Sequence, residues 1–275
     1  MGRALEVISG RVTAPGSTFT AVTMAAGNSL TVRNAGLDTD VRLLQLWVDN
    51  QGAGAIRVRS PKLHDNVQGI RYDITVSDPS PLLPWGVHQK LIPQDILTVE
   101  MTGSATAGDI EDFGALLYYS NLPGSDARLA NVEDVMRRIS HIVTVENSIA
   151  AGAGGGYTGE EALDAEFDLL KANTDYALLG YTVDAECAVV RWRGSDSANL
   201  GVGGPGLDTL RHVTANWFMR LAAAYGLPLI PVFNSANKGA ILIDVVQDEV
   251  ATAVVVNSIF AELGGQAGAT LGARP

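Results

Sequence analysis

Hydrophobic and polar residues alternate along most of the first half of the chain, in short runs separated by glycine and proline. This pattern is typical of β-strands that bury one face. Three prolines, Pro79, Pro81 and Pro84, exclude a regular helix between 78 and 85. We expect strands at 6–12, 19–24, 29–33, 41–49, 55–60, 71–77, 95–101 and 113–119. That number of short strands indicates an antiparallel sandwich or barrel, and it fits a jelly roll by count.

In the middle of the chain the spacing of apolar residues changes to that of a helix. Between 125 and 143 they line one face, with Glu133, Asp134, Arg137 and Arg138 on the other. We expect a helical connector there, packed on its own sandwiches or placed at a subunit contact. Asn131 followed by Asp134 offers a second, later start for this helix.

The second half mixes strand and helix signals. We expect strands at 141–147, 176–184, 187–193, 227–233, 240–246 and 251–260. A helix is predicted over 158–172, where Thr158 and Glu161 have capping-box spacing. Another is predicted over 207–226, which has no internal proline and ends at Gly226.

Segments of the first half recur in the second half in the same order. RLLQLWVD at 42–49 matches ALLGYTVD at 177–184, an offset of 135. Three further pairs match at offsets of 134, 140 and 138: AIRVRS at 55–60 with VVRWRG at 189–194, WG at 85–86 with YG at 225–226, and LIP at 91–93 with LIP at 229–231. Ordered matches at nearly constant offset indicate a tandem copy of one domain.

The two predicted helices of the second half fall opposite strand or proline-rich segments of the first half. Either the copies differ there or one helix is wrong, and the capping box favours the helix at 158–172. The repeat predicts a mainly β protein. It would have a first β-sandwich domain at 1–124, the helical connector at 125–143, and a second β-sandwich domain at 144–275 that includes a glycine-rich C-terminal tail.

Composition supports a folded protein with an acidic surface. At 47% hydrophobic and 18% charged residues, the chain of 275 residues is globular and long enough for two domains. A net charge of −11 disfavours sequence-specific nucleic-acid binding. The arginines of the RVR and RWR segments are the local exceptions, and we expect them to face solvent or an interface. No apolar run is long enough to span a bilayer, and the N-terminal segment lacks a signal-peptide core, so we expect a soluble protein made in a cytoplasm.

The residue types that carry chemistry do not form a recognisable site. None of the histidines, His64, His88, His141 and His212, has metal-ligand spacing, which argues against a bicupin-type metal enzyme. Cys187, the single cysteine, lies at the start of an apolar strand, and we expect it to be buried and structural. We therefore assign no catalytic, cofactor-binding or metal-binding residue.

Two weaker patterns need a structural test. Gly201, Gly203 and Gly206 satisfy GxGxxG, but a polar stretch and Pro205 interrupt the strand-turn-helix context, so we expect a flexible loop. GAGGG at 152–156 is expected to form a hinge or an exposed loop. An acidic group precedes the last strand of each half. We expect each group to form a solvated turn, and the alternative is a calcium site at a subunit contact. These groups are Asp109, Glu111 and Asp112 in the first half and Asp248 and Glu249 in the second.

The paired strands and the two LIP segments resemble, in architecture, the double-barrel (tandem jelly-roll) major capsid proteins of icosahedral viruses and bacteriophages. In that group two jelly rolls in one chain give a trimer six-fold-like corners, so that one protein tiles a pseudo-hexagonal lattice. The resemblance implies a non-enzymatic shell subunit of the virion, assembled in the host cytoplasm. Its partners would be copies of itself, as a trimer or larger assembly, and other virion proteins.

Two alternatives stay open. One is a virion decoration or tail-tube protein. The other is a carbohydrate- or receptor-binding β-sandwich module, in which exposed Trp47, Trp85 or Tyr181 would stack on a sugar.

Overall fold

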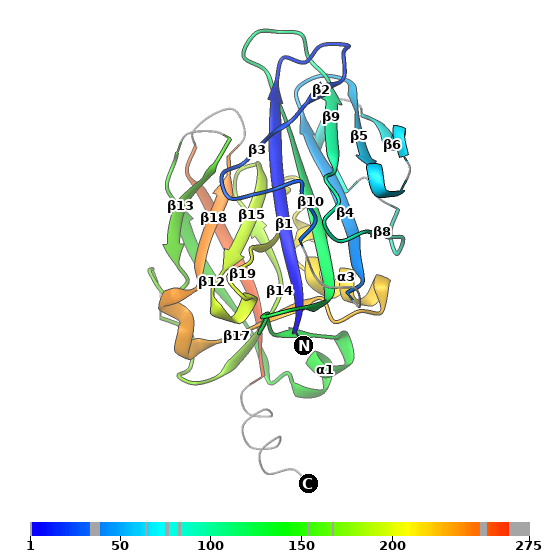
Figure 1. Ribbon diagram of the computed structural model, residues 1–275. Coiled ribbons are helices and arrows are strands. Elements are labelled where there is room, and N and C mark those ends of the chain that lie inside the picture. The colour runs from blue at the N-terminus through cyan, green and yellow to red at the C-terminus, as the bar shows by residue number, and fades with distance from the viewer. Residues whose placement is uncertain are drawn as a thin grey trace.

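The first half of the chain folds into two facing antiparallel sheets (Figure 1). The structure, a computed structural model, describes residues 2–33, 39–63, 65–74, 77–81, 84–152, 155–166, 168–247 and 252–263. One sheet has the order β3-β1-β10-β4-β7, with β8 also paired to β4: β3 Thr23–Met24, β1 Gly2–Thr13, β10 Ile110–Leu122, β4 Val41–Asn50, β7 Ser77–Pro81 and β8 Gln89–Leu91. The facing sheet has the order β2-β9-β5-β6: β2 Thr20–Ala21, β9 Thr98–Thr102, β5 Gly54–Ser60 and β6 Asp65–Ile74.

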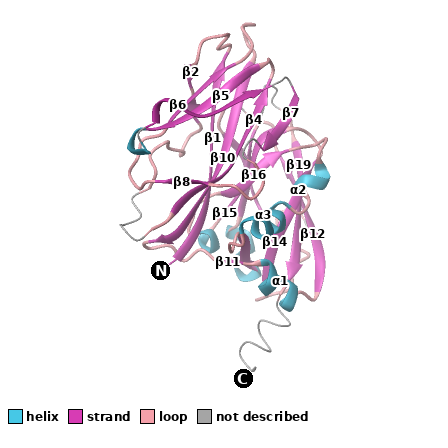
Figure 2. Ribbon diagram, turned by 90° about the vertical axis from the view of Figure 1, so that its right-hand side faces the viewer, coloured by secondary structure: helices cyan, strands magenta, loops and turns pink. Residues whose placement is uncertain are grey.

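The second half repeats this plan. One sheet has the order β11-β17-β14-β19-β12: β11 Leu129–Ala130, β17 Ile230–Asn234, β14 Asp175–Val183, β19 Val254–Glu262 and β12 His141–Ile149. The other has the order β13-β18-β15-β16: β13 Tyr157–Ala162, β18 Leu242–Val246, β15 Cys187–Arg193 and β16 Val202–Gly206. Helices α1 Val132–Arg138, α2 Arg211–Thr214 and α3 Trp217–Tyr225 lie in this half, as Figure 2 shows. Short 3₁₀ turns span Pro61–Leu63, Ser195–Ser197 and Ser235–Ala240. None of the helices in the described part of the chain is long and apolar enough to cross a membrane.

Both halves have the strand order of a jelly roll. We number the main strands of each half in chain order, leave out the short edge strands β3 and β11, and give β7 and β8 the sixth place together. One sheet of each half then reads 1-8-3-6 and the other 2-7-4-5. This order is that of two Greek keys wound into a double sheet. The predicted fold class, two tandem antiparallel jelly-roll-like sandwiches, is confirmed.

A β-bulge recurs at the same aligned position in the two domains. Along β10, neighbouring residues pair with Leu43 and Gln45 of β4, so that Leu44 is left out of the ladder. Along β19, neighbouring residues pair with Leu178 and Gly180 of β14, which leaves out Leu179. Leu44 and Leu179 are 135 positions apart, the offset of the sequence repeat. Because bulges are specific features of a strand pair, their coincidence supports duplication at the level of single residues.

The LIP match does not extend to register. In the first domain, Leu91 of β8 pairs with Val41. Tyr176 is the residue that corresponds to Val41 in the second domain, and it pairs with Phe233 instead of Leu229. The two LIP segments therefore belong to corresponding strand regions but are displaced along them.

The predicted helix at 158–172 is wrong. Residues 157–162 form β13, which pairs with β18, and Gly159 takes a φ of 69° inside a bulge between Thr158 and Glu161. Glycine allows this left-handed conformation, and the pairing outweighs the local capping signal. The helix predicted at 207–226 is present as α2 and α3, and it ends at Gly226 with a φ of 63°.

Two other predicted elements are shorter than expected. The connector helix covers only α1, since β11 precedes it and β12 follows it. Asn131 caps it, and its side chain accepts a hydrogen bond from the Asp134 amide, which was the alternative start. In place of a strand at 29–33, the structure has an isolated bridge between Thr31 and Ile96.

One sheet belongs to two hydrophobic cores. In β1, β10 and β4 successive side chains point to opposite faces, and both faces are buried. Ile8 and Phe113 lie on the face that closes the core of the first domain. Val7, Trp47 and Leu116 lie on the other face, in one continuous cluster with the core of the second domain. Figure 1 shows this sheet between β15 and β18 on one side and β5 and β6 on the other.

Candidate assembly interface

The two jelly rolls meet face to face through their sheets. The outer face of β1, β10 and β4 packs on the outer face of β15 and β16. The Val7 amide donates to the Gly201 carbonyl at 2.8 Å, and Trp47 Nε1 donates to the Ala188 carbonyl at 2.8 Å. Gly203 has no side chain, and a Cβ there would lie 3.1 Å from Val7 Cγ1. The contact is therefore close enough to exclude water between the sheets.

Helix α3 adds a second part to this contact. The Trp217 ring meets Trp47 edge-on, with ring centroids 6.2 Å apart. The Tyr225 hydroxyl accepts from Gln45 Nε2 at 2.9 Å, and it donates to the carbonyl of Leu44. Leu44 is the bulged residue of β4, so the bulge turns its carbonyl toward the second domain.

In the second domain an arginine–carboxylate cluster lies in this contact. Asp244 of β18 is fully buried and receives two hydrogen bonds from Arg191, at 2.7 and 2.5 Å. Arg193 donates to the same carboxylate at 3.3 Å. The Arg191 guanidinium also lies over the Tyr157 ring, 3.2 Å from its centroid, which is a cation–π contact.

The Tyr157 ring links this cluster to the first domain. Its hydroxyl donates to Asn28 Oδ1 at 3.1 Å, and burial raises the pKa of Tyr157 well above its usual value. Arg11 of β1 pairs with Asp112 and also donates to the Gln247 carbonyl at 2.9 Å.

The first domain has the same cluster at the equivalent positions. Arg57 donates to Glu100 at 2.6 Å, and Arg59 lies 3.0 Å from the same carboxylate. The Arg57 guanidinium lies 4.1 Å from the centroid of the Phe19 ring. Arg57 is directly opposite Glu100 in the β5–β9 register, as Arg191 is opposite Asp244 in the β15–β18 register.

We call the outer surface of β2, β9, β5 and β6 the arginine face; it carries Phe19, Arg57, Arg59, Arg71 and Glu100. In contrast to its counterpart, this face is partly open to solvent. The side chains of Arg57 and Glu100 are 23% and 13% exposed, against 12% and 0% for Arg191 and Asp244. All four arginines keep some exposure: Arg57 and Arg59 are each 23% exposed, and Arg191 and Arg193 are 12% and 31% exposed. The clear difference between the two clusters lies in the carboxylates, because Glu100 is partly exposed and Asp244 is not.

The sequence pattern pointed to the arginines but not to their partners. Phe19-Thr20 and Tyr157-Thr158 are a further aligned pair, at an offset of 138. Thr20 faces Met101 next to Glu100, and Thr158 faces Val245 next to Asp244. In each half, an aromatic–threonine pair precedes the arginine strand, and an acidic residue lies on a later strand. This pattern could have identified the partners of the arginines from the sequence.

The three described histidines have different surroundings. His88 Nε2 is 2.6 Å from Arg42 Nη1, and burial together with the Arg42 charge lowers the pKa of His88. His141 pairs with Glu262, His212 is exposed, and His64 lies outside the described residues. Within the described ranges no group of three His, Cys, Asp or Glu side chains is arranged to hold a metal ion.

The glycine patterns and Cys187 have structural positions. Cys187 is fully buried, as expected. The flexible loop expected at the GxGxxG segment is wrong, because residues 202–206 form the buried strand β16. A Cβ on Gly204 would lie 2.6 Å from Trp217 Nε1, so glycine is required by close packing rather than by a ligand. In the GAGGG segment, residues 153–154 lie outside the described residues, and Gly155 turns with a φ of 88°.

The solvated turn expected at the first acidic group is wrong for two of its three residues. Glu111 is buried and accepts from the amides of Ser104 and Gln51, at 2.6 and 2.9 Å, while burial raises its pKa. Asp112 is buried against Arg11. The second acidic group, Asp248 and Glu249, lies outside the described residues.

The aromatic residues considered for sugar stacking are mostly in the core. Trp47 and Tyr181 are fully buried, so neither can stack on a sugar. Trp85 is half-exposed, and the Arg220 guanidinium lies 5.0 Å from its ring centroid.

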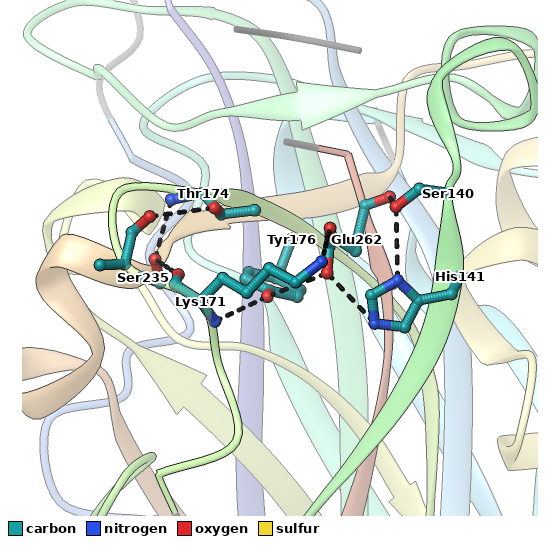
Figure 3. Close-up of polar contacts among 8 residues, drawn as sticks. Ser140, His141, Lys171, Thr174, Tyr176, Ser235 and Glu262 are labelled. Atoms are coloured by element: carbon teal, nitrogen blue, oxygen red, sulfur yellow. Dashed lines mark hydrogen bonds and ion pairs between the residues drawn. The ribbon is translucent and has the colours of Figure 1, made fainter. Parts of the chain in front are cut away.

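A polar cluster ties the end of β19 to neighbouring segments (Figure 3). Glu262 Oε1 accepts from Lys171 Nζ at 2.7 Å, and Glu262 Oε2 lies 3.1 Å from His141 Nε2. Ser140 lies beside His141, but its hydroxyl donates to the Glu262 main-chain carbonyl at 3.3 Å. Lys171 also accepts, through its carbonyl, a hydrogen bond from Ser235. These contacts join four chain segments, which is the behaviour of a structural clamp.

Comparison with known proteins gives structural likeness only. No protein-family model and no curated protein match the chain. Among solved structures, it is similar to the acidic stable capsid structure of Helicobacter pylori bacteriophage KHP30, with a TM-score of 0.28, 4% identity, and coverage of 43% of this chain and 91% of that one. It is also similar to the PBSX exported protein XepA, with a TM-score of 0.28, 8% identity and coverage of 93% and 86%, and to the STIV MCP, with a TM-score of 0.24, 8% identity and coverage of 96% and 97%.

Proposed function

We propose that this chain is a non-enzymatic structural protein of a virus or phage particle, a capsid shell subunit that assembles with copies of itself. The observation that carries the proposal is the pair of jelly rolls of identical strand order, already joined face to face within one chain. Two equivalent modules with one built-in contact are suited to repeating that contact between chains.

The proposal extends to the assembly and its place. We expect trimers or larger assemblies in the virion, formed in the host cytoplasm, with other virion proteins as further partners. The buried cluster around Asp244 and the polar clamp at Glu262 support a structural role, because their charged groups are used in holding the fold.

The test is the behaviour of the purified full-length chain. Size-exclusion chromatography with light scattering, followed by electron microscopy, should show trimers or larger particles. A monomer at all concentrations, and in particular one that binds glycans, would overturn the proposal in favour of a binding module.

A further inference from the structure

The first jelly roll holds an apolar cavity between its two sheets. The cavity has a volume of about 280 Å³ and is bordered by β4 and β8 on one side and by β5 and β6 on the other (Figure 1). Its described lining consists of six aliphatic side chains and two polar ones, Ser60 and Gln89. None of these lining residues is aromatic or charged, so the cavity is suited to an aliphatic molecule.

The cavity has a buried floor and a half-open rim. Leu43 and Leu91 form part of the floor, and each is 2% exposed. Leu63, Ile70 and Gln89 also line the cavity but are only half-buried. A ligand would therefore enter past these three side chains, and its far end would lie against the two leucines.

At the equivalent positions the second jelly roll has aromatic residues. Val58, which lines the cavity, is aligned with Trp192 in the repeated arginine strands, at an offset of 134. Leu91 and Phe233 hold the same place on the ladder, since each pairs with the equivalent residue of β4 or β14. Two lining residues of the first domain are thus smaller than their counterparts in the second.

The aromatic rings of the second domain pack tightly in this place. Trp192 is fully buried, its ring centroid lies 4.8 Å from that of Tyr181, and its Nε1 donates to Ser258 Oγ at 3.0 Å. Phe233 is also buried, with its ring centroid 6.4 Å from that of Phe260. The same strand order can therefore be filled by side chains. A void in only one of the two copies is not a requirement of the fold, and voids are unfavourable because their lining loses dispersion contacts.

The size of the cavity selects a small ligand. Its volume exceeds the roughly 150 Å³ at which a dry aliphatic cavity takes up a benzene-sized molecule. It lies near the lower end of ligand sites, which begin at about 300 Å³. An aliphatic lining without rings favours a flexible hydrocarbon chain over a planar ring system. The polar end of such a chain would stay at the rim, where the Gln89 amide offers hydrogen-bonding groups.

We propose that this cavity binds the hydrocarbon chain of a small single-chain amphiphile of the fatty-acid class, with its polar head at the rim beside Gln89. The inference goes beyond the proposed function, because it concerns a ligand site inside one domain. It does not depend on association between chains.

Titration calorimetry of the purified full-length chain with decanoate tests the binding. We expect one site per chain and a negative heat-capacity change, since apolar surface is buried. Butyrate has the same carboxylate but a much shorter chain, and it should bind at least tenfold more weakly because buried methylene groups supply the affinity. Equal affinity for the two acids would show that only the carboxylate is recognised, and it would overturn the inference.

Variants that copy the second domain test the location. Leu91→Phe and Val58→Trp should each lower the affinity for decanoate at least tenfold, because each fills the cavity with the side chain of its counterpart. Circular dichroism and thermal unfolding check that both variants are folded, and Leu91→Phe, the smaller change, decides the outcome if Val58→Trp does not fold. Ile142→Phe, on an exposed position of β12, is the matched control and should bind decanoate like the wild type.

The outcomes separate this site from the proposed function. If the wild-type chain does not bind decanoate, or if folded Leu91→Phe binds it as well as the wild type does, the inference is wrong. Either result leaves the subunit role standing, since that role is tested by association between chains.

Discussion

At the residue scale, one arrangement of an aromatic ring, two arginines and a carboxylate is built twice and used in two environments. Asp244 is fully buried beside Arg191 and the partly exposed Arg193, whereas Glu100 keeps some contact with solvent beside Arg57 and Arg59. A buried ion pair that loses one partner leaves an uncompensated charge in a low-dielectric site, and water reduces this cost where the pair is partly exposed. The duplication therefore provides its own internal control.

Replacing the two carboxylates should have unequal effects. Asp244→Ala should lower the free energy of unfolding by about 3–5 kcal/mol, since it leaves the largely buried Arg191 without its carboxylate partner. Glu100→Ala should lower it by no more than about 2 kcal/mol, because water can solvate the remaining guanidinium groups. Urea unfolding measures both, and equal losses would show that the two clusters share one environment.

The clamp at Glu262 should make stability depend on acid pH. Burial by itself raises the pKa of Glu262, but the hydrogen bond from Lys171 and the nearby His141 outweigh it and hold the pKa below its usual value. Since the folded pKa is lower than the unfolded one, Glu262 contributes stability that is present above the unfolded pKa of about 4.3 and is lost as the pH falls through the folded pKa.

Glu262→Gln should therefore lower stability at neutral pH and flatten its decline toward acid. Urea unfolding at a series of pH values measures this. Glu133→Gln, on the exposed side of α1, serves as the control and should keep the wild-type slope. A Glu262→Gln variant with an unchanged slope would mean that the carboxylate titrates alike in both states.

At the scale of elements, close packing decides where glycine stands. Gly114 of β10 faces Trp47 of β4 in the register, and a Cβ at this position would lie 2.2 Å from Trp47 Cε2. The Trp47 ring cannot move away freely, because its Nε1 donates a hydrogen bond to the Ala188 carbonyl and the ring meets Trp217 edge-on. The strand thus needs glycine so that the tryptophan can reach the second domain.

Gly114→Ala should lower the free energy of unfolding by about 1–3 kcal/mol through overpacking. Gly156→Ala is the matched control, because nothing lies within 4 Å of a Cβ built there, and its effect should stay within about 0.5 kcal/mol. Thermal unfolding followed by tryptophan fluorescence compares them. Equal shifts for the two variants would contradict the packing explanation.

At the scale of the whole molecule, the sheet of β1, β10 and β4 serves two cores at once. Its outer face, with Leu5, Val7, Leu44 and Trp47, would meet water if the domains separated. Exposing that much apolar surface is unfavourable, so the two jelly rolls should not unfold independently.

The chain should therefore unfold in a single cooperative transition despite its two domains. Scanning calorimetry should give a van't Hoff enthalpy close to the calorimetric one. Leu5→Asp, which puts a charge into the contact, should split the transition or lower its midpoint. Two separate transitions in the wild type would mean that the contact adds little to stability.

The sequence alone determined the features that depend on local periodicity. Strands such as β1, β4 and β10 follow from side-chain alternation, because a period of two is fixed by the backbone itself. The repeat around Leu44 and Leu179 was likewise visible, since duplicated strands keep their residues. Asn131 marked the start of α1 for the same local reason, as a capping side chain needs only its own helix.

Features that depend on distant partners became visible only in the folded chain. The capping pattern at Thr158 does not form a helix, because this segment pairs with β18. The glycines of β16 lie in a buried strand, because Val7 and Trp217 pack against them. The carboxylate partners of the arginines were missed, since each lies on a strand that is adjacent in space and remote in sequence. Which face meets which is set by packing across the whole molecule, so the buried cluster at Asp244 and its open counterpart at Glu100 could be told apart only after the chain had folded.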